Sequence, residues 1–214
     1  MTLVTRSGVT WDVTEPGDYF WKSWEAGTWE PKTLATIDRL VRPGSTFVDI
    51  GAWIGPTAMW GARLASRVIA VEPDPVALLY LCANVAGNAP NVLVVGEAIS
   101  DHTGLALVQS FPTGQFGDSM THLSRKGQTV RCWTLPDLFA ECQVTDVSLV
   151  KMDIEGGEAI VLEHVAPFLA SLGVPLLVSQ HGDWCSRPIQ RSWFDGYSTL
   201  QGEIGGWDDL LALP

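Results

Sequence analysis

The sequence predicts an α/β protein, with helices on both faces of a doubly wound, mostly parallel, Rossmann-like sheet. Two observations support this fold class. Short apolar strands alternate with helix-length segments from residue 46 to residue 179. Within this alternation, residues 47–75 read FVDIGAWIGPTAMWGARLASRVIAVEPDP: an apolar strand ending in an acid, a glycine loop opening a helix, and a second strand ending in another acid. This order places a pocket for a nucleotide-like ligand at the carboxyl edge of the sheet.

The segments on either side of this motif complete the expected fold. Residues 1–30 are expected to form a cap of one hairpin and one helix. The segment 111–127 is rich in turn formers and is expected to be a long loop that acts as a functional flap. The expected elements are a hairpin over 3–13, helices over 18–26, 31–41, 56–65, 75–86, 136–142 and 157–172, strands over 46–50, 68–72, 91–95, 147–152 and 174–179, and an antiparallel excursion of 104–110 with 128–134.

Helix 75–86 has a clear start and an expected buried face. Asp74 is placed to cap its first turn. Its inward face is expected to hold Val76, Leu79, Tyr80 and Ala83. After residue 180 the pattern predicts little beyond a possible helix over 188–194.

The composition is that of a globular protein with an acidic surface. The 214 residues carry 24 acidic and 13 basic side chains, which gives a net charge of −11. We expect a single domain over 1–214, as a monomer or homodimer. Nucleic acid is not expected as a partner, because affinity for a phosphate backbone comes mainly from Lys and Arg. A neutral small molecule or saccharide is the easier substrate for an acidic surface.

The sequence pattern predicts neither a membrane span nor a signal peptide. No apolar run approaches the ~20 residues of a membrane span, so no membrane association is expected. The N-terminus lacks the apolar core of a signal peptide, and the four cysteines show no CxxC spacing. These features predict a cytoplasmic protein with free thiols.

The glycine loop distinguishes between cofactors. In DIGAWIG, Trp53 stands where a dinucleotide enzyme needs a second glycine for its backbone to approach pyrophosphate. Asp49 would repel a pyrophosphate but suits the cationic methionine end of S-adenosylmethionine. Glu72 follows the loop at the spacing of an acid that accepts both ribose hydroxyls. The pattern therefore favours a methyl donor over a nicotinamide. The alternative is structural, with a loop that only packs tightly and a Glu72 that only caps the next helix.

From about Trp29 to its end, the chain resembles the FkbM-type S-adenosylmethionine-dependent O-methyltransferases, which have a class I methyltransferase fold. The matching segments are VRPGSTFVDIGAWIG, VIAVEPDP, GEAISDHTG and LVKMDIEGGE, of which the last is the most specific. Such enzymes methylate hydroxyl groups of sugars and natural products. The chain also looks like the small actinobacterial sugar O-methyltransferases linked to methylmannose polysaccharide.

The resemblance implies a set of residues that contact the cofactor. The methionine end is expected against the glycine loop, the ribose at the acid after the second strand, and the adenine beside residues 97–99. Asp153 is expected near the reacting methyl group. The implied residues are Glu30, Asp49, Gly51, Ala52, Trp53, Gly55, Glu72, Pro73, Glu97, Ala98, Ile99 and Asp153.

An alcohol must lose a proton as it attacks the methyl group, and a positioned base accelerates this by about 10²–10⁴-fold. His181 is the preferred candidate because it follows strand 174–179 at the carboxyl edge of the sheet. Asp153 is the competing base or an orienting group, and Glu155 is included as a catalytic candidate because, two residues on along an extended strand end, it would point the same way. Glu158 is interpreted as structural, since it offsets the dipole of the following helix. A capping or core role for His181 stays open.

Three further residues are expected to contact the acceptor: His122, Gln180 and Trp184. The sequence has Gln180-His181 where many family members place an acid before the His. A Mg²⁺ variant stays open, with Asp153, His181 and Asp183 as ligands. Two functional alternatives also remain. One is methylation of a polyketide or other natural-product hydroxyl, and the other is a subunit that binds S-adenosylmethionine without catalysis.

Overall fold

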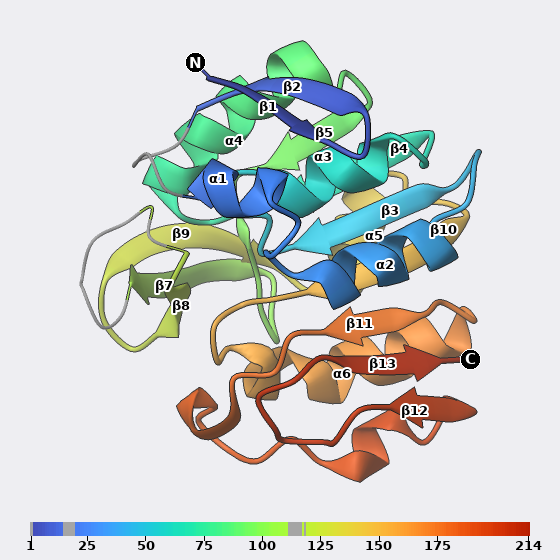
Figure 1. The fold of residues 1–214 in the computed structure, drawn as a ribbon. Helices are drawn as coiled ribbons and strands as arrows, with labels where there is room; N and C mark the ends of the chain where they lie inside the picture. Colours follow the sequence, from blue (N-terminus) through green and yellow to red (C-terminus); the bar gives the residue numbers. More distant parts are fainter. Residues whose placement is uncertain (1, 15–19, 111–116, 118) are drawn as a thin grey trace.

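The computed structural model describes residues 2–14, 20–110, 117 and 119–214, and a seven-stranded sheet lies at its centre (Figure 1). Five adjacent strands, which extend to one edge of this sheet, are parallel, and β13 runs antiparallel to both of its neighbours. In spatial order the strands are β12 (Thr199–Gln201), β13 (Leu210–Leu213), β11 (Leu176–Val178), β10 (Val147–Met152), β3 (Thr46–Ile50), β4 (Arg67–Val71) and β5 (Val92–Val95).

Helices cover both faces of this sheet, as the alternation of strands and helices predicts. One core cluster packs α5 (Leu135–Glu141), α6 (Glu158–Ser171) and the 3-10 turn η2 (Arg191–Phe194) against one face. A second cluster packs α1 (Phe20–Glu25), α2 (Pro31–Leu40), α3 (Pro56–Ala62) and α4 (Pro75–Asn88) against the other. Neighbouring residues of β3 face opposite clusters, with Phe47 on one side and Val48 on the other. The predicted doubly wound, mostly parallel fold is confirmed.

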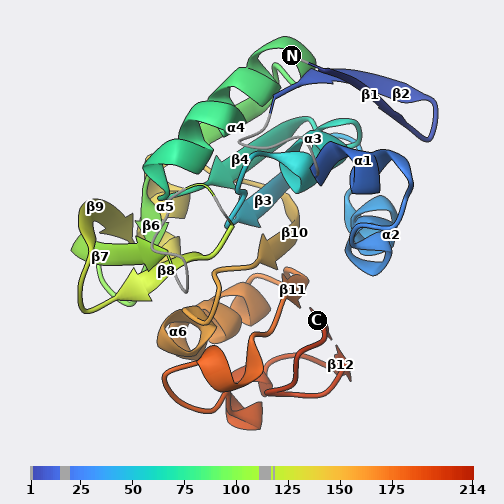
Figure 2. The same cartoon turned by 60° about the vertical axis from the view of Figure 1, so that its left-hand side comes forward.

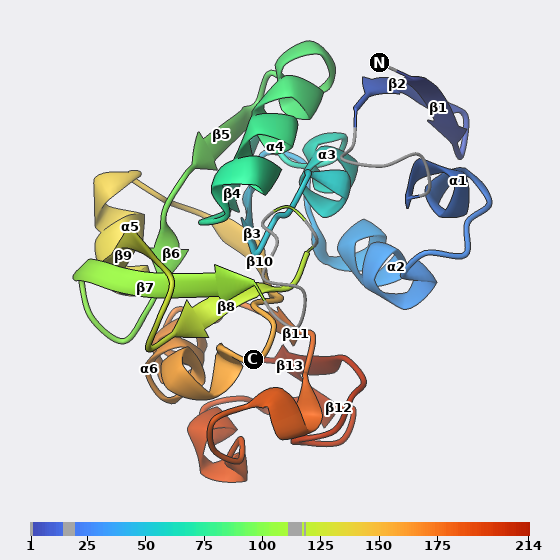
Figure 3. The same ribbon diagram turned by 90° about the vertical axis from the view of Figure 1, so that its left-hand side faces the viewer.

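Two smaller sheets accompany the central one. The hairpin of β1 (Thr2–Arg6) and β2 (Val9–Val13) packs on α1 and α4 and turns at Ser7-Gly8 as predicted (Figure 2). A four-stranded sheet has the order β6 (Ala98–Ile99), β9 (Gln128–Trp133), β7 (Gly104–Ser110) and β8 (Thr121–Ser124). In Figure 1 the arrowhead of β3 points toward this small sheet, and Figure 3 shows it from that side. The small sheet therefore lies at the carboxyl edge of the parallel strands.

The flap segment differs from its prediction. Within 111–127, residues Thr121–Ser124 form β8, which pairs antiparallel with β7 from Ser110↔Thr121 to Leu107↔Ser124. The prediction of a loop without structure was wrong there, because a four-residue strand is stabilised by its partner rather than by its own pattern. The remainder of the predicted flap includes residues 111–116 and 118, which lie outside the described residues.

The predicted inward face of α4 was also wrong. Leu79 is 71% exposed, and the buried residues are Ala77, Leu81, Asn84 and Val85. Asn84 lies on the buried face because its carboxamide accepts from Thr14 N and donates to the carbonyls of Thr14 and Ile54. An apolar pattern cannot assign a polar residue to the core. The predicted cap is confirmed, since Asp74 accepts from the backbone of the first helical turn.

The buried Asn84 gives a direct test of how the hairpin is attached. The substitution Asn84→Ala leaves backbone groups of residues 14 and 54 without partners and should lower the free energy of unfolding by about 2–3 kcal/mol, measured by urea denaturation. Asn88→Ala is the matched control, because Asn88 makes the equivalent pair of bonds to Asp12 at an exposed site. We expect less than about 1 kcal/mol from the control. Equal effects of the two changes would contradict the assignment.

Candidate functional site

A cavity of about 270 Å³ lies at the carboxyl ends of β3, β4 and β10, the edge where the strand order reverses. The ends of β3, β4 and β10 supply its polar floor, and β7 and β8 close it from above. Its lining includes Phe20, Trp29, Glu30, Ile50, Gly51, Ala52, Trp53, Thr57, Glu72, Pro73, Asp74, Ala98, Ile99, Val108, Ser119, Thr121, His122, Leu123, Lys151, Asp153 and Glu155.

The ends of β3 and β10 are in direct contact at Gly51. This glycine has φ +76°, and a Cβ atom built on it would lie 1.7 Å from the carbonyl oxygen of Asp153. Only glycine permits this approach. Behind the contact, Lys151 Nζ lies 3.4 Å from both Asp49 Oδ1 and Asp153 Oδ2, and it donates to Gly51 O at 3.2 Å. A buried cation thus joins the two strand ends.

The charges around Lys151 are mutually dependent. Burial alone would lower the pKa of Lys151, but Asp49, Asp153 and Glu30 raise it well above its usual value. Burial raises the pKa of Asp49, against the effects of Lys151 and the Thr57 hydroxyl. Burial also raises the pKa of Glu30 to about 7, against the opposing charge of Lys151. The site therefore holds more buried acidic groups than basic ones, and burial disfavours the ionised form of these acids.

Three buried carboxylate oxygens here accept no hydrogen bond from the described residues: Glu30 Oε2, Asp49 Oδ1 and Asp153 Oδ1. Lys151 and His181 approach two of them as ion pairs, at 3.4 and 3.5 Å. Buried acceptors without donors are costly unless a ligand supplies the missing partner. Glu30 and Asp153 line the cavity, so a cationic ligand there would satisfy them.

Glu72 is held at the end of β4 by two backbone groups. Its Oε2 accepts from Trp53 N at 2.7 Å and its Oε1 accepts from Asp74 N at 2.8 Å. Burial raises the pKa of Glu72 to about 7 in spite of these bonds. Glu72 lines the cavity, and each carboxylate oxygen can accept a second hydrogen bond, which fits the expected role of accepting two ribose hydroxyls.

The small sheet is fastened over the cavity by Asp74 and Trp53. Asp74 Oδ2 accepts from Gly117 N at 2.7 Å and from the Thr121 hydroxyl at 2.6 Å. The indole of Trp53 donates to Gly117 O at 3.0 Å. The same Asp74 carboxylate caps α4 with its other oxygen. The roof of the cavity is therefore coupled to the glycine loop and to α4.

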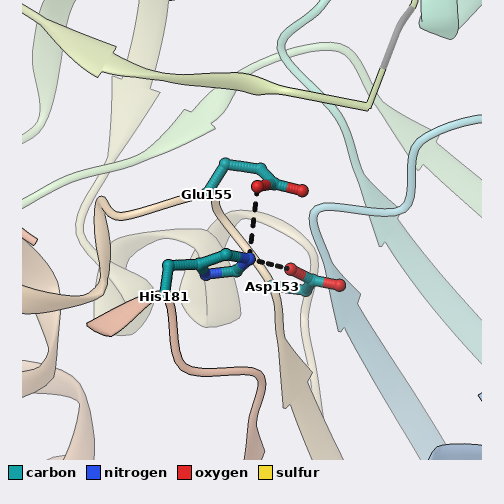
Figure 4. Close-up of side chains that lie close together, drawn as sticks. All are labelled: Asp153, Glu155 and His181. Atoms are coloured by element: carbon teal, nitrogen blue, oxygen red, sulfur yellow. Dashed lines mark ion pairs between the residues drawn. The ribbon is translucent and has the colours of Figure 1, made fainter. Parts of the chain in front are cut away.

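The three predicted catalytic residues come together next to the cavity (Figure 4). His181 Nε2 lies 3.2 Å from Glu155 Oε2 and 3.5 Å from Asp153 Oδ1. One ligand atom from each of the three residues lies within 4.8 Å of the others, so the group could also surround a metal ion. The side chain of Asp183, the other predicted metal ligand, lies outside the described part of the structure.

Glu158 organises this group, which its interpretation as a dipole partner missed. Its carboxylate is fully buried, and it accepts from Ile154 N at 3.0 Å and from Gly156 N at 2.9 Å. Its Oε1 also lies 3.0 Å from His181 Nδ1. Because Nδ1 pairs with Glu158, Nε2 is the nitrogen that faces Asp153 and Glu155.

The carboxylates of Asp153, Glu155 and Glu158 determine the protonation state of His181. Burial would lower the pKa of His181, but Glu158, Asp153 and Glu155 together raise it to about 9. Burial and the neighbouring Asp153 raise the pKa of Glu155 to about 7, against the effect of His181. Without a ligand, His181 is therefore protonated at neutral pH. It can accept a proton only after a positive charge approaches and lowers its pKa.

The structure brings most predicted cofactor residues to the cavity, with three exceptions. Asp49 lies beneath the floor, bonded to Thr57 and paired with Lys151. Glu97 turns away to the Trp133 indole and to Arg131. Gly55 is not among the lining residues. Those that line it are Glu30, Gly51, Ala52, Trp53, Glu72, Pro73, Ala98, Ile99 and Asp153.

The three residues predicted to contact the acceptor lie in different places. His122 lines the first cavity, whereas Gln180 lines a second one. Trp184 lines neither cavity, but its ring stacks on His181 at 6.0 Å between centroids.

Sequence reasoning missed Lys151, although a lysine within the otherwise apolar strand 147–152 was a usable signal. Among the described residues, no helix is both long and apolar enough to cross a membrane.

The raised pKa of Glu30 predicts a pH-dependent stability. The folded state holds this proton up to about pH 7, whereas the free carboxyl releases it near 4.5, so the stabilisation present below pH 4.5 is lost as the pH rises through 7. Glu30→Gln should therefore raise the free energy of unfolding at pH 8 by on the order of 2 kcal/mol and change it little at pH 5. Chemical denaturation at both pH values measures this. The exposed Glu141→Gln is the control, and a gain of equal size at both pH values for Glu30→Gln would refute the assignment.

Comparison with known proteins identifies the family. The model of the methyltransferase FkbM domain matches residues 49–180. A curated relative, ribosomal protein L11 methyltransferase of Pelotomaculum thermopropionicum, is 43% identical over 65 residues, 30% of this chain and 20% of its own length. A methyltransferase FkbM structure from Methylobacillus flagellatus has 17% identity and a TM-score of 0.48, over 94% of this chain and 56% of that one. An RNA methyltransferase from Salinibacter ruber with S-adenosyl-L-homocysteine has 15% identity and a TM-score of 0.43, over 85% and 86%.

This chain spans about half of the length of the FkbM structure and a fifth of the curated relative. The family match itself covers more than half of the present chain; it includes the glycine loop, Glu72, Asp153 and Glu155, and it ends one residue before His181. The protein belongs to the FkbM methyltransferase family.

Proposed function

We propose that the protein transfers a methyl group from S-adenosylmethionine to a hydroxyl group of a sugar or short saccharide. The observation that supports this best is the set of buried acceptor oxygens without donors beside the first cavity. S-adenosylmethionine carries a sulfonium and an ammonium group. Both cations would stabilise the negative charge of the ionised acids beside the first cavity. A pyrophosphate would add to that charge.

In this proposal the cofactor occupies the first cavity. Glu72 accepts the ribose hydroxyls, and Ala98 and Ile99 with the apolar roof residues Val108 and Leu123 contact the adenine. Glu30 lies on the methionine side, next to Gly51 and Asp153. The methyl group then points toward the carboxyl end of β10. This arrangement uses the predicted contacts that line the cavity and leaves Glu97 outside the site.

The sulfonium is itself an excellent leaving group, so the residues mainly align the two reactants, an effect worth about 7–11 kcal/mol. His181 Nε2 takes the proton of the attacking hydroxyl. Glu158 fixes the ring through Nδ1, and the positive charge bound near Asp153 lowers the pKa of His181 from about 9. Glu155, with a pKa of about 7, is the competing proton acceptor.

Two substitutions separate chemistry from positioning. His181→Ala should lower kcat at least about 100-fold with little change in the Kd for S-adenosylhomocysteine, because a positioned base is lost. Glu158→Gln should shift the rising limb of the pH–rate profile to lower pH, since it removes the strongest partner that raises the pKa of His181. Steady-state kinetics from pH 6 to pH 10 and calorimetry measure both effects. Glu163→Gln, exposed on the same helix, is the control.

Full activity of His181→Ala would remove His181 from the mechanism. A pH–rate profile of Glu158→Gln that matches wild type would show that Glu158 only shapes the turn over 154–156. Methyl transfer assayed with mannosides and glucosides, a macrolide and an RNA oligonucleotide tests the acceptor class. Tight cofactor binding without turnover of any acceptor would favour a non-catalytic subunit.

A metal-assisted variant uses the same residues. Asp153, Glu155 and His181 would hold Mg²⁺, and Glu158 would orient the imidazole as carboxylates commonly do behind a metal-bound histidine. Such an ion would supply Lewis-acid activation of the acceptor hydroxyl, and His181 Nε2, as one of its ligands, would then not be the proton acceptor. If this variant holds, EDTA should abolish turnover and added Mg²⁺ should restore it. An unchanged rate in EDTA would exclude it.

A further inference from the structure

A second cavity, of about 390 Å³, lies on the other side of the group around His181. It is bounded by the start of α2, the ends of β10 and β11, and the loop before β13. Glu30, Asp153 and Glu155 line both cavities. The two spaces therefore meet at the carboxylates that face His181 Nε2, which is where a methyl donor and an acceptor must approach one another.

One exposed aromatic ring lines this second cavity, and a second exposed ring packs against the first from outside the lining. Trp207 is part of its lining and is 58% exposed, and Trp184 is 45% exposed. Their rings meet edge to face, with centroids 5.4 Å apart, and Trp184 stacks on the imidazole of His181. Large aromatic faces open to solvent and next to a reactive histidine are typical of ligand contact surfaces.

The loop that carries Trp207 is fixed by Gln180. This side chain is 2% exposed; it donates to Glu203 O and Asp208 O at 2.7 and 2.9 Å and accepts from Gly205 N at 2.7 Å. The carboxamide that was expected to contact the acceptor is thus used to shape the loop. Gln180 acts on the second cavity through the position of Trp207.

Two further contacts hold the end of this loop. Asp209 accepts from the hydroxyls of Ser179 and Thr33, which joins the loop to β11 and α2. Gly182 has φ +44°, and a Cβ atom on it would lie 2.5 Å from the ring of Trp207, so the indole lies directly against the backbone. The aromatic surface is therefore held in position before any ligand binds, which reduces the entropic cost of binding.

The charge of this cavity restricts its ligand. Its acidic lining residues are Glu30, Asp153, Glu155, Asp208 and Asp209, and the basic residues among the described lining residues are Lys32 and His181. Carboxylates accept hydrogen bonds from hydroxyl groups but repel phosphate and carboxylate groups. Flat rings beside several acceptors match a pyranose, which has apolar C–H faces and hydroxyl edges.

We propose that the second cavity is the acceptor subsite and that it binds an uncharged pyranose ring against Trp207, which Trp184 supports from the side of His181. This inference rests on the proposed methyl transfer and adds where the acceptor lies and what charge it carries. The hydroxyl to be methylated points to Glu155 and His181, at the junction with the first cavity. Because acidic residues outnumber basic ones in the lining, we expect sugar phosphates and nucleotide sugars to bind more weakly than neutral sugars.

The test measures saccharide binding to the protein saturated with S-adenosylhomocysteine. Mannobiose, maltose and cellobiose are the neutral probes, and mannose 1-phosphate is the anionic one, followed by calorimetry and saturation-transfer NMR. At least one neutral disaccharide should bind, and mannose 1-phosphate should bind at least tenfold more weakly. Trp207→Ala and Trp184→Ala should each weaken the disaccharide at least tenfold, and Trp207→Phe should weaken it less. Leu172→Ala, at an equally exposed position on the C-terminal side of α6, is the control. The affinity for S-adenosylhomocysteine should stay within threefold in all variants.

The outcomes separate this inference from the proposed function. If a saccharide is methylated with an unchanged KM in both tryptophan variants, the subsite lies elsewhere and the function stands. If no neutral disaccharide binds the wild-type protein, or if the phosphate binds as well as they do, the inference is overturned. If a disaccharide binds and both tryptophan variants lose it, the subsite stands even when no methyl transfer is found.

Discussion

The site depends on the buried ammonium group of Lys151. It joins the carboxyl ends of β3 and β10 by pairing with Asp49 and Asp153 behind the contact at Gly51. Without this cation, two carboxylates would lie unneutralised in a region of low dielectric constant, at a cost of several kcal/mol. With it, the strand ends can meet while an excess of acidic over basic groups remains at the cavity wall. That excess is what a cationic methyl donor would neutralise.

The proton balance of the site follows from the same charges. Glu30, Glu72 and Glu155 each have a pKa raised to about 7, and His181 has a pKa raised to about 9. A site in this state holds protons that a bound cation would displace. Under the proposed function, binding of the donor therefore prepares the base. Glu158 links this chemistry to the backbone, since one buried carboxylate shapes the turn over 154–156 and orients His181.

Much of this arrangement could be predicted from the sequence, because local patterns encode it. Strands with an acid at their end, the glycine loop and the cap at Asp74 follow from short-range rules, and the parallel sheet then brings Asp49, Asp153 and His181 to one edge. The failures have long-range causes. Asn84 is buried because backbone groups of Thr14 and Ile54 need partners. Gln180 is committed to a loop that begins more than twenty residues later.

The roles of Trp207 and β8 were likewise invisible to pattern analysis. β8 is a strand because β7 lies beside it, and Trp207 lies against Gly182, the residue after His181, only because the last described strand, β13, returns along β11. Lys151 is an intermediate case. Its position in a buried strand was visible, but its partners could be assigned only once β3 and β10 were known to be neighbours.

The most direct test of the central claim is calorimetry of the purified protein with S-adenosylmethionine, S-adenosylhomocysteine and NADH. The buried carboxylates around Lys151 predict that S-adenosylmethionine and S-adenosylhomocysteine bind at one site and that NADH does not bind. They also predict that S-adenosylmethionine, which carries the sulfonium, binds at least as tightly as S-adenosylhomocysteine, which is an uncharged thioether. Binding of NADH without binding of either adenosyl compound would contradict the account.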